Sequence, residues 1–189
     1  DTTLTSWSMA KSITHAALGL LVADGLVDVA APAAVPEWAG TDKAEITLLH
    51  LLEMRSGLRF VEDYVDDGVS HCLEMLFGES GPSHAAYAAA LPLDHAPGTV
   101  YNYSSGTTNI IARIIGDIHL AYLDAGAHLI STNTFGTPPY VLAEYDLRDR
   151  CHEITLAAAR IARAAVDARS TAEDPRFLLG AMGPGTRTI

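Results

Sequence analysis

The first residues with a chemical pattern are Ser8 and Lys11, in the segment Ser8-Met9-Ala10-Lys11. The apolar spacing that follows favours a helix from Ser8 to Ala23, and residues three apart lie on one helix face, so hydroxyl and amine can meet. A serine hydroxyl becomes a good nucleophile when a base takes its proton, and a lysine can be that base. Alone this pattern is weak evidence for a nucleophilic serine, because a helix-capping serine followed by a surface lysine gives the same sequence pattern.

A second pattern, Tyr101-Asn102-Tyr103-Ser104-Ser105-Gly106, follows the turn Ala96-Pro97-Gly98 and leads into a helix. A tyrosine in such a loop can point its hydroxyl into a cleft. The alternative is that both tyrosines pack as core aromatics against the next helix, as tyrosines often do.

Further characteristic sequence motifs accompany these two patterns along the chain. These are Asp24-Gly25-Leu26, the segment 46–58 (Ile-Thr-Leu-Leu-His-Leu-Leu-Glu-Met-Arg-Ser-Gly-Leu) and Pro97-Gly98-Thr99. The series resembles the serine hydrolases related to class C β-lactamases and D-alanyl-D-alanine carboxypeptidases. It is most similar to the esterases and 6-aminohexanoate-dimer hydrolases of that group, over nearly all of residues 4–117.

The resemblance implies roles for particular residues. Ser8 would attack an acyl carbon and become acylated, Lys11 would hold or take its proton, and Tyr103 would pass a proton to the leaving group. Ser105 stands where many members have an asparagine, which favours an esterase or amidase over a true β-lactamase. Tyr64 resembles a tyrosine that contacts the substrate amide, although a packed loop tyrosine is an equal alternative. Such a site needs no metal and no cofactor.

Two parts of the family pattern are not found in this sequence. One is the strand with a Lys-Thr-Gly or His-x-Gly motif, which offers a backbone N–H to the oxyanion hole. The other is the set of strands that precedes the serine helix. Because the chain starts at Asp1 without a methionine and ends just after the loop-like Gly183-Pro184-Gly185, both ends are expected to be internal to a longer protein. Loss of one oxyanion donor lowers a rate by roughly a hundredfold or more, so impaired catalysis is expected.

From Ile118 onward the sequence carries motifs of a different kind. The stretch 118–136 contains Thr132-Asn133-Thr134-Phe135, and Leu142 to Tyr145 and Ala181 to Pro184 continue it. It resembles the homocysteine-binding barrel of cobalamin-dependent methionine synthases and other homocysteine S-methyltransferases. Strand ends carry the site of such a barrel, so Asn133 and Thr134 would bind substrate. The alternative is that they cap the next turn.

Methyl transfer in that family uses a zinc ion held by three cysteines. This chain has two cysteines, Cys72 and Cys151, and its histidines at 119, 128 and 152 lack ligand spacing. About a quarter of a barrel is covered. We therefore expect no bound metal and no methyl transfer.

The elements expected after residue 106 alternate helix and strand. They are a long helix Thr107–Ala125, a strand His128–Thr132, a helix Leu147–Ala168 and a strand Arg176–Met182. Strand, helix and strand predict a parallel βαβ unit. Its two strands leave exposed edges, so self-association is possible. The predicted fold class is α/β, predominantly helical: the helical part of a β-lactamase-like serine hydrolase fused to a partial (β/α) barrel.

Composition excludes several partners. Hydrophobic residues make up 49% of the 189 residues and charged residues 19%, which is typical of a globular protein. The net charge of -11 repels phosphate backbones and anionic lipid surfaces, so no nucleic acid or membrane partner is expected. No apolar run reaches the roughly 18 residues of a membrane span, and no signal-peptide pattern occurs, so the cytoplasm is the expected compartment.

The two resemblances meet near Gly116-Asp117-Ile118. We therefore predict two domains, 1–117 and 118–189, in a chimera of two fragments. The two resemblances leave three alternative hypotheses for the function. The first is a serine esterase or amidase that acts on a small ester or amide. The second is a fragment of a homocysteine S-methyltransferase, and the third is a protein without catalysis.

Overall fold

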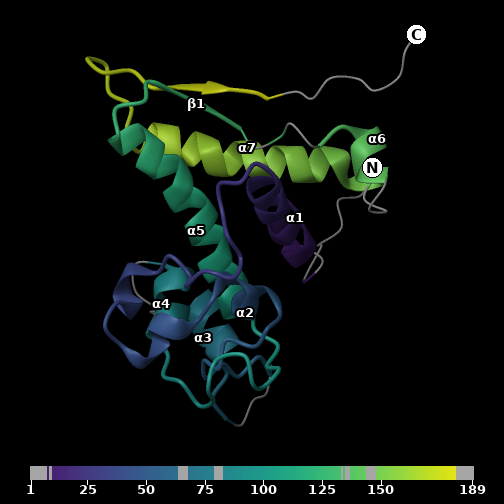
Figure 1. The fold of residues 1–189 in the computed structure, drawn as a ribbon, viewed down its shortest axis with the longest axis vertical. Coiled ribbons are helices and arrows are strands. Elements are labelled where there is room, and N and C mark those ends of the chain that lie inside the picture. The colour runs from purple at the N-terminus through teal and green to yellow at the C-terminus, as the bar shows by residue number, and fades with distance from the viewer. Residues whose placement is uncertain are drawn as a thin grey trace. The chain divides into compact units, whose positions relative to one another are not determined.

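Figure 1 shows the computed structural model, which describes residues 8, 10–63, 68–78, 83–132, 134, 137–143 and 148–181. Over these residues the protein is mostly helical with little sheet, which confirms the predominantly helical α/β class. By its internal contacts the chain divides into two compact units. Unit 1 comprises Asp1–Thr14 and Val27–Ile114, and unit 2 comprises His15–Leu26 and Ile115–Ile189.

Short helices make up most of unit 1. They are the 3₁₀ helices η2 (Pro36–Trp38) and η3 (Asp42–Glu45) and the α-helices α2 (Leu48–Leu52), α3 (His71–Phe77) and α4 (His84–Ala90), joined by the first turns of α1 (Ala10–Ala23) and α5 (Ser105–Asp124). Thr47, Ser70 and Ser83 cap α2, α3 and α4, each accepting a hydrogen bond from the backbone N–H three residues on. The sequence predicts a short helix that Thr47 caps and that runs through Met54. The Thr47 cap confirms the start of this helix, but α2 ends at Leu52, because Met54 adopts a left-handed φ of 56°.

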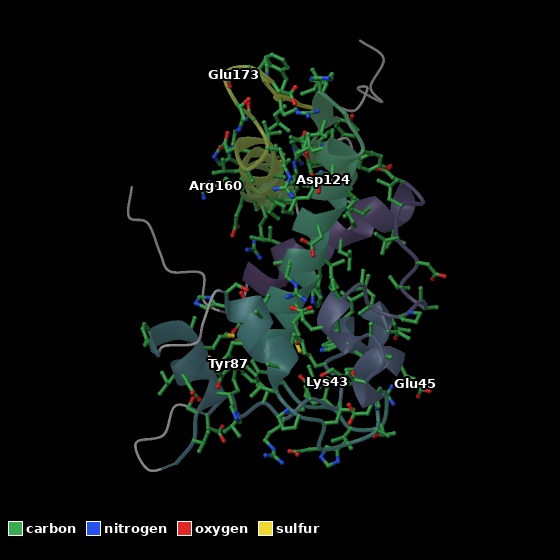
Figure 2. The ribbon with its side chains drawn as sticks, turned by 90° about the vertical axis from the view of Figure 1, so that its left-hand side faces the viewer. Lys43, Glu45, Tyr87, Asp124, Arg160 and Glu173 are labelled. Atoms are coloured by element: carbon green, nitrogen blue, oxygen red, sulfur yellow. The ribbon has the colours of Figure 1, made fainter. Side chains whose placement is uncertain are left out.

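Helix α4 is fixed by polar contacts at its end and along its side. Trp38 Nε1 and Lys43 Nζ both donate to the carbonyl of Ala89, each at 2.9 Å, and so satisfy a carbonyl of the last turn. Tyr87, labelled with Lys43 in Figure 2, donates its hydroxyl proton to Glu74 Oε2 at 2.7 Å. This bond joins α4 to α3.

Helix α5 runs without interruption from Ser105 to Asp124, which confirms one helix through the predicted junction. Gly116 lies inside it, and an interior glycine weakens a helix by only about 1 kcal/mol relative to alanine. The sequence predicts one apolar stripe along this helix, through Ile111, Ile114, Ile115, Ile118 and Tyr122. That prediction is wrong at its far end, because Tyr122 is 50% exposed whereas Leu123 is 2% exposed. The buried positions instead follow steps of four residues through Ile115, His119 and Leu123, as a straight helix row does.

Unit 2 contains the predicted βαβ arrangement. Strands β1 (Leu129–Ser131) and β2 (Phe177–Leu179) are parallel, with Leu129 opposite Phe177, and helix α7 (Cys151–Asp167) connects and packs against them (Figure 1). Both strands are shorter than predicted: His128, Thr132 and Arg176 lie outside the ladder, and Met182 lies outside the described residues. The remaining elements are α6 (Pro139–Leu142) and the 3₁₀ helix η5 (Arg148–Arg150).

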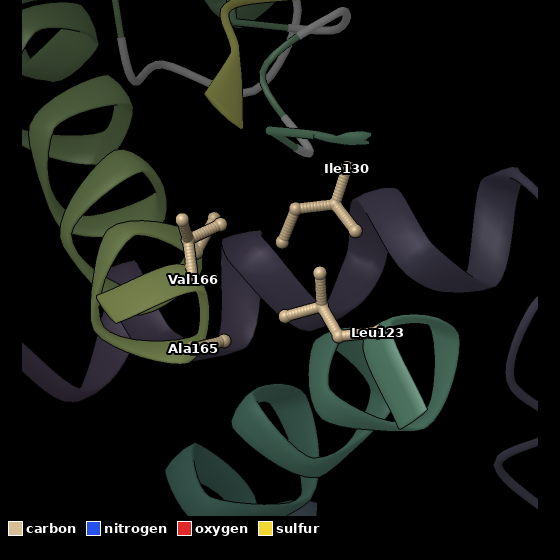
Figure 3. Packing of buried hydrophobic residues seen from close by; sticks show 5 residues of the cluster. Leu123, Ile130, Ala165 and Val166 are labelled. Carbon is tan, nitrogen blue, oxygen red and sulfur yellow. The ribbon is translucent and has the colours of Figure 1, made fainter. Parts of the chain in front are cut away.

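One buried cluster of unit 2 combines side chains of α5, β1 and α7. Figure 3 shows Leu123 of α5, Ile130 of β1 and Val166 of α7 pointing toward one another, and Ala162 and Ala165 complete the cluster. The small alanines let α7 approach the strands closely. An ion pair between Arg169 and Asp124, 2.6 Å from Nε to Oδ1, closes the same end of the unit.

Candidate functional site

The residues of the S-x-x-K pattern lie at the start of α1. Helix α1 begins at Ala10, two residues later than predicted, so Ser8 lies before it and Lys11 lies in its first turn. Ser8 is exposed and Lys11 is half-buried. The predicted hydrogen bond between Ser8 and Lys11 stays a prediction.

The Lys11 amine is held by the second sequence pattern. Its Nζ donates to Ser105 Oγ at 2.7 Å. Ser105 in turn donates its hydroxyl proton to Glu62 Oε1 at 2.5 Å and its backbone N–H to Glu62 Oε2 at 2.7 Å. A continuous chain of hydrogen bonds thus runs from the Lys11 Nζ through a hydroxyl to a carboxylate, and the charge of the carboxylate strengthens the bond that it accepts.

Tyr103 lies beside the same amine. Lys11 Nζ is 5.0 Å from the centroid of the Tyr103 ring, within the range of a cation–π contact. The loop before Tyr103 is fixed by Asn102, whose backbone N–H donates to Met54 O at 2.7 Å and whose side chain donates to Phe60 O at 3.0 Å. The structure therefore brings Lys11, Tyr103 and Ser105 together, although Lys11 and Ser105 are 94 residues apart.

The start of α5 fixes Ser105. Ser104 is buried and its hydroxyl accepts the backbone N–H of Thr107 at 3.1 Å, which is the geometry of an N-cap. The Glu62 carboxylate binds the N–H of Ser105, so a negative charge lies at the positive end of the helix. Glu62 is half-buried and also accepts the Cys72 thiol at 3.6 Å.

A pocket of about 650 Å³ opens at these residues. Its lining includes the apolar side chains of α3 and the polar residues Ser8, Lys11, Ser105, Thr108 and Asn109. Ser8 and Lys11 therefore face one space, which is large enough for a small substrate.

The remaining predicted site residues have different fates. Tyr64 and Asn133 lie outside the described residues. Thr134 is buried, and its Oγ1 donates to the carbonyl of Ala181 at 2.6 Å and lies 2.6 Å from Thr132 Oγ1. In the structure this hydroxyl joins the ends of β1 and β2, and its predicted role in substrate binding stays a prediction.

Unit 2 has a pocket of its own, of about 550 Å³, between the end of α1, the end of α5 and β1. His119 lies in its wall. The imidazole is 5% exposed, and its Nε2 has no hydrogen-bond partner among the described residues. Burial lowers the pKa of His119, so the neutral form is favoured there.

Within the described ranges, no group of three or more histidine, cysteine, aspartate and glutamate side chains is arranged to hold a metal ion. His128 instead contacts Asp174, 3.2 Å from Nδ1 to Oδ1. In the same part of the chain, no helix combines the length and the apolar character that crossing a bilayer requires.

Sequence reasoning missed two groups at the hydrolase-like site. Glu62 was not a predicted site residue, since nothing in its local pattern connects it to Ser105, 43 positions later. The apolar wall from α3 was missed because residues 59–82 show no clear period.

Comparison with known proteins gives two family matches. The family model described as Beta-lactamase matches residues 1–121, and the model described as Homocysteine S-methyltransferase matches residues 71–189. Methionine synthase of Mycobacterium leprae (strain TN) is 39% identical over 74 residues, which are 39% of this chain and 6% of that protein. Methionine synthase of Mycobacterium tuberculosis (strain ATCC 25618 / H37Rv) is 38% identical over 74 residues, with the same coverage. The chain thus spans about 6% of the length of these relatives, and both predicted resemblances are confirmed.

Proposed function

Because the chain belongs to the Beta-lactamase family over residues 1–121 and to the Homocysteine S-methyltransferase family over residues 71–189, an arrangement like that of a chimera, we propose that its first part is a serine hydrolase. The proposed substrate is a small ester or amide, and the proposed nucleophile is Ser8. The observation that carries this proposal is the hydrogen-bonded chain Lys11–Ser105–Glu62 beside the pocket that Ser8 lines.

Acylation begins when Ser8 Oγ attacks the carbonyl carbon of the substrate. The serine proton passes to the Lys11 amine, and the carbonyl oxygen takes up the negative charge. Collapse of this intermediate breaks the bond to the leaving group, which receives a proton by way of Tyr103. The products of this step are an ester on Ser8 and a free alcohol or amine.

Deacylation repeats the sequence with water in place of Ser8. Lys11 takes a proton from the water, the hydroxide oxygen attacks the acyl carbon, and Ser8 leaves with the proton restored. Positioned proton transfer of this kind contributes about 10²–10⁴-fold to a rate. No metal and no cofactor enters either step.

Ser105 and Glu62 are proposed to position Lys11. Since the Ser105 hydroxyl both accepts from Lys11 and donates to Glu62, it directs the amine within the pocket. The substrate-binding roles predicted for Ser105 and Tyr64 remain part of the proposal. A serine offers no amide group here, which supports an esterase or amidase over a β-lactamase.

A burst assay with p-nitrophenyl acetate tests this function. We expect release of one p-nitrophenol per chain, followed by slow turnover. Ser8→Ala should abolish the burst, and Lys11→Ala should slow it about 10²–10⁴-fold. As a matched control, Ser12→Ala changes the neighbouring exposed serine of α1 and should leave the burst unchanged. An equal burst from Ser8→Ala would refute the assignment.

For the second part of the chain we propose the domain boundaries 1–117 and 118–189 and no methyl transfer by this chain. Its similarity to methionine synthases favours a homocysteine-binding role, with Asn133 and Thr134 as the substrate contacts. Titration of unlabelled homocysteine into isotopically labelled protein tests this role: chemical-shift changes confined to unit 2 would support it.

We also propose self-association through the strand edges, where Leu129, Phe177 and Leu179 are exposed. No nucleic acid or membrane partner is proposed.

A further inference from the structure

We propose that the pocket of unit 2 binds a small uncharged aromatic alcohol, whose hydroxyl pairs with Nε2 of His119 and whose rings lie on apolar side chains. This pocket, called here the His119 pocket, has a volume of about 550 Å³. Ligand sites of proteins commonly occupy about 300–1,000 Å³. The inference does not depend on Ser8 or on the proposed hydrolase function, because every residue that lines the His119 pocket belongs to unit 2.

Neither family match contains the whole His119 pocket. Its residues from the end of α1 and the turn that follows, Leu21, Asp24 and Leu26, lie only in the part that the Beta-lactamase model matches. Its residues between 127 and 132, and Ala181, lie only in the part that the Homocysteine S-methyltransferase model matches. The pocket therefore depends on the junction of the two segments, and a site of either family does not account for it.

His119 supplies a polar group of the pocket that lacks a partner. The imidazole is 5% exposed, and its Nε2 has no hydrogen-bond partner among the described residues. A buried nitrogen without a partner destabilises the protein, so a ligand that offers one regains that free energy. Burial also lowers the pKa of this imidazole, which favours the neutral form. A hydroxyl suits a neutral imidazole in either tautomer, because it can both donate and accept a hydrogen bond.

Apolar side chains make up most of the remaining lining. Leu21 and Ile130 are buried, and Figure 3 shows Ile130 within the packed cluster of unit 2. Leu26 and Leu129 add apolar surface that is about half exposed. Aromatic rings that cover such surface gain a large apolar contact area. The buried part of the wall is held by the cluster before a ligand binds, so it needs no ordering on binding.

The charge of the lining disfavours ionised ligands. Asp24 is the lining residue that is charged at neutral pH, and it is exposed. An anionic ligand would meet this negative charge, and the neutral His119 offers no positive charge to balance it. A cationic ligand would pair with a carboxylate that faces water, and exposed pairs contribute little while the ammonium loses its hydration. An uncharged alcohol avoids both costs.

Access to Nε2 requires one movement, since this atom is closed to solvent in the structure. Tyr122 stands three residues after His119, on the same face of α5, and also lines the pocket. It is 50% exposed, and exposed side chains change rotamer within picoseconds to nanoseconds. Rotation of Tyr122 toward solvent is therefore the step that admits the hydroxyl to His119 in this proposal.

The experiment compares 2-naphthol with 2-methylnaphthalene, which has a methyl group in place of the hydroxyl. Each is titrated into the isotopically labelled full chain, and the amide chemical shifts of residues 118–132 give its dissociation constant. His119→Phe keeps a ring but removes the nitrogen, so it should lower the preference for 2-naphthol over 2-methylnaphthalene about two- to tenfold. His152→Phe is the matched control, because His152 is an exposed residue of α7 that does not line the pocket, and it should leave the preference unchanged. Equal preferences in the wild type and His119→Phe, or no saturable shift in residues 118–132 with either ligand, overturn the proposal.

A second measurement uses the wild-type chain alone, so it does not depend on how His119→Phe folds. With histidine ring nitrogens labelled, 2-naphthol should shift the Nε2 resonance of His119, and 2-methylnaphthalene should shift it much less. The anion 2-naphthoate should bind more weakly than 2-naphthol. An unmoved His119 resonance at saturation, or tighter binding of 2-naphthoate, contradicts the proposed ligand class. Displacement of 2-naphthol by homocysteine would assign the pocket to the methyltransferase-like part and would also overturn the proposal.

Discussion

Replacement of Glu62 by alanine is expected to destabilise unit 1 and to release Lys11. The Glu62 carboxylate accepts two hydrogen bonds from Ser105, one from the backbone N–H at 2.7 Å and one from the hydroxyl at 2.5 Å. Glu62→Ala removes both acceptors and leaves the first N–H of α5 without a partner. Glu62→Gln keeps one oxygen acceptor and removes the charge. It therefore separates the loss of hydrogen-bond acceptors from the loss of the negative charge.

The magnitude follows from the two bonds. A hydrogen bond to a charged group contributes about 1.5–3 kcal/mol, and the lower end applies because Glu62 is only half-buried. A carboxylate at a helix N-terminus adds about 0.3–1 kcal/mol. We therefore expect Glu62→Ala to lower the free energy of unfolding by about 3–4 kcal/mol, and Glu62→Gln by about half as much.

Urea unfolding monitored by circular dichroism measures this change. The matched control is Glu53→Ala, since Glu53 forms an exposed ion pair with Arg55 at 3.4 Å, where both side chains are more than 40% exposed. Pairs of this kind contribute about 0–1 kcal/mol. The burst assay, without urea, adds a second measurement. Glu62→Gln should slow acylation at unchanged KM, because Lys11 loses its fixed direction but the residues that line the pocket are unchanged.

Two results would contradict this reasoning. If Glu62→Ala and Glu53→Ala cost the same free energy, the carboxylate does not cap α5. If Glu62→Gln lowers stability but leaves the acylation rate unchanged, Glu62 is structural and does not position Lys11.

Three further outcomes are expected. Gly106→Ala should destabilise by about 1–3 kcal/mol, because a Cβ there would lie 2.6 Å from a ring carbon of Phe60, whereas Gly116→Ala, with no atom within 4 Å, should stabilise α5 by up to about 1 kcal/mol; paired urea titrations check both. Burial lowers the pKa of His119, so the unfolded chain binds a proton that the folded chain does not, and the free energy of unfolding should fall as pH drops through about 6.5, by at most about 1.4 kcal/mol per pH unit. His119→Gln should flatten that dependence, and an unchanged pH profile would contradict it. Purification without chelator should give far less than one zinc per chain by elemental analysis, and one tightly held zinc would reveal a site that neither sequence nor described geometry indicates.

Local sequence patterns were sufficient for the long elements. Helix α5 was predicted because its apolar residues recur at helical spacing, and the single Gly116 costs too little to break it. The βαβ unit was predicted because two apolar runs flank a long alanine-rich helix, and the parallel register of Leu129 with Phe177 confirms it. These signals depend only on neighbouring residues.

Long-range contacts and short helices could not be predicted from local sequence patterns. Helix α3 contains the nearly continuous apolar run Cys72 to Phe77, which has no polar face to reveal a period. The contact of Glu62 with Ser105 depends on how two distant loops fold back, and no spacing rule encodes it. The sequence did predict that Lys11 and Tyr103 belong to one site, because a family order of motifs carries that long-range information.

The most direct test of the central claim is identification of the residue that a fluorophosphonate probe modifies. The wild-type protein, incubated with the probe and digested, should carry one adduct by mass spectrometry, on the hydroxyl of Ser8. Ser8→Ala should remain unlabelled, and Lys11→Ala should be labelled far more slowly. Equal labelling of the wild type and Ser8→Ala, or an adduct on Ser105 with Ser8 unmodified, would contradict the assignment of Ser8 as the nucleophile.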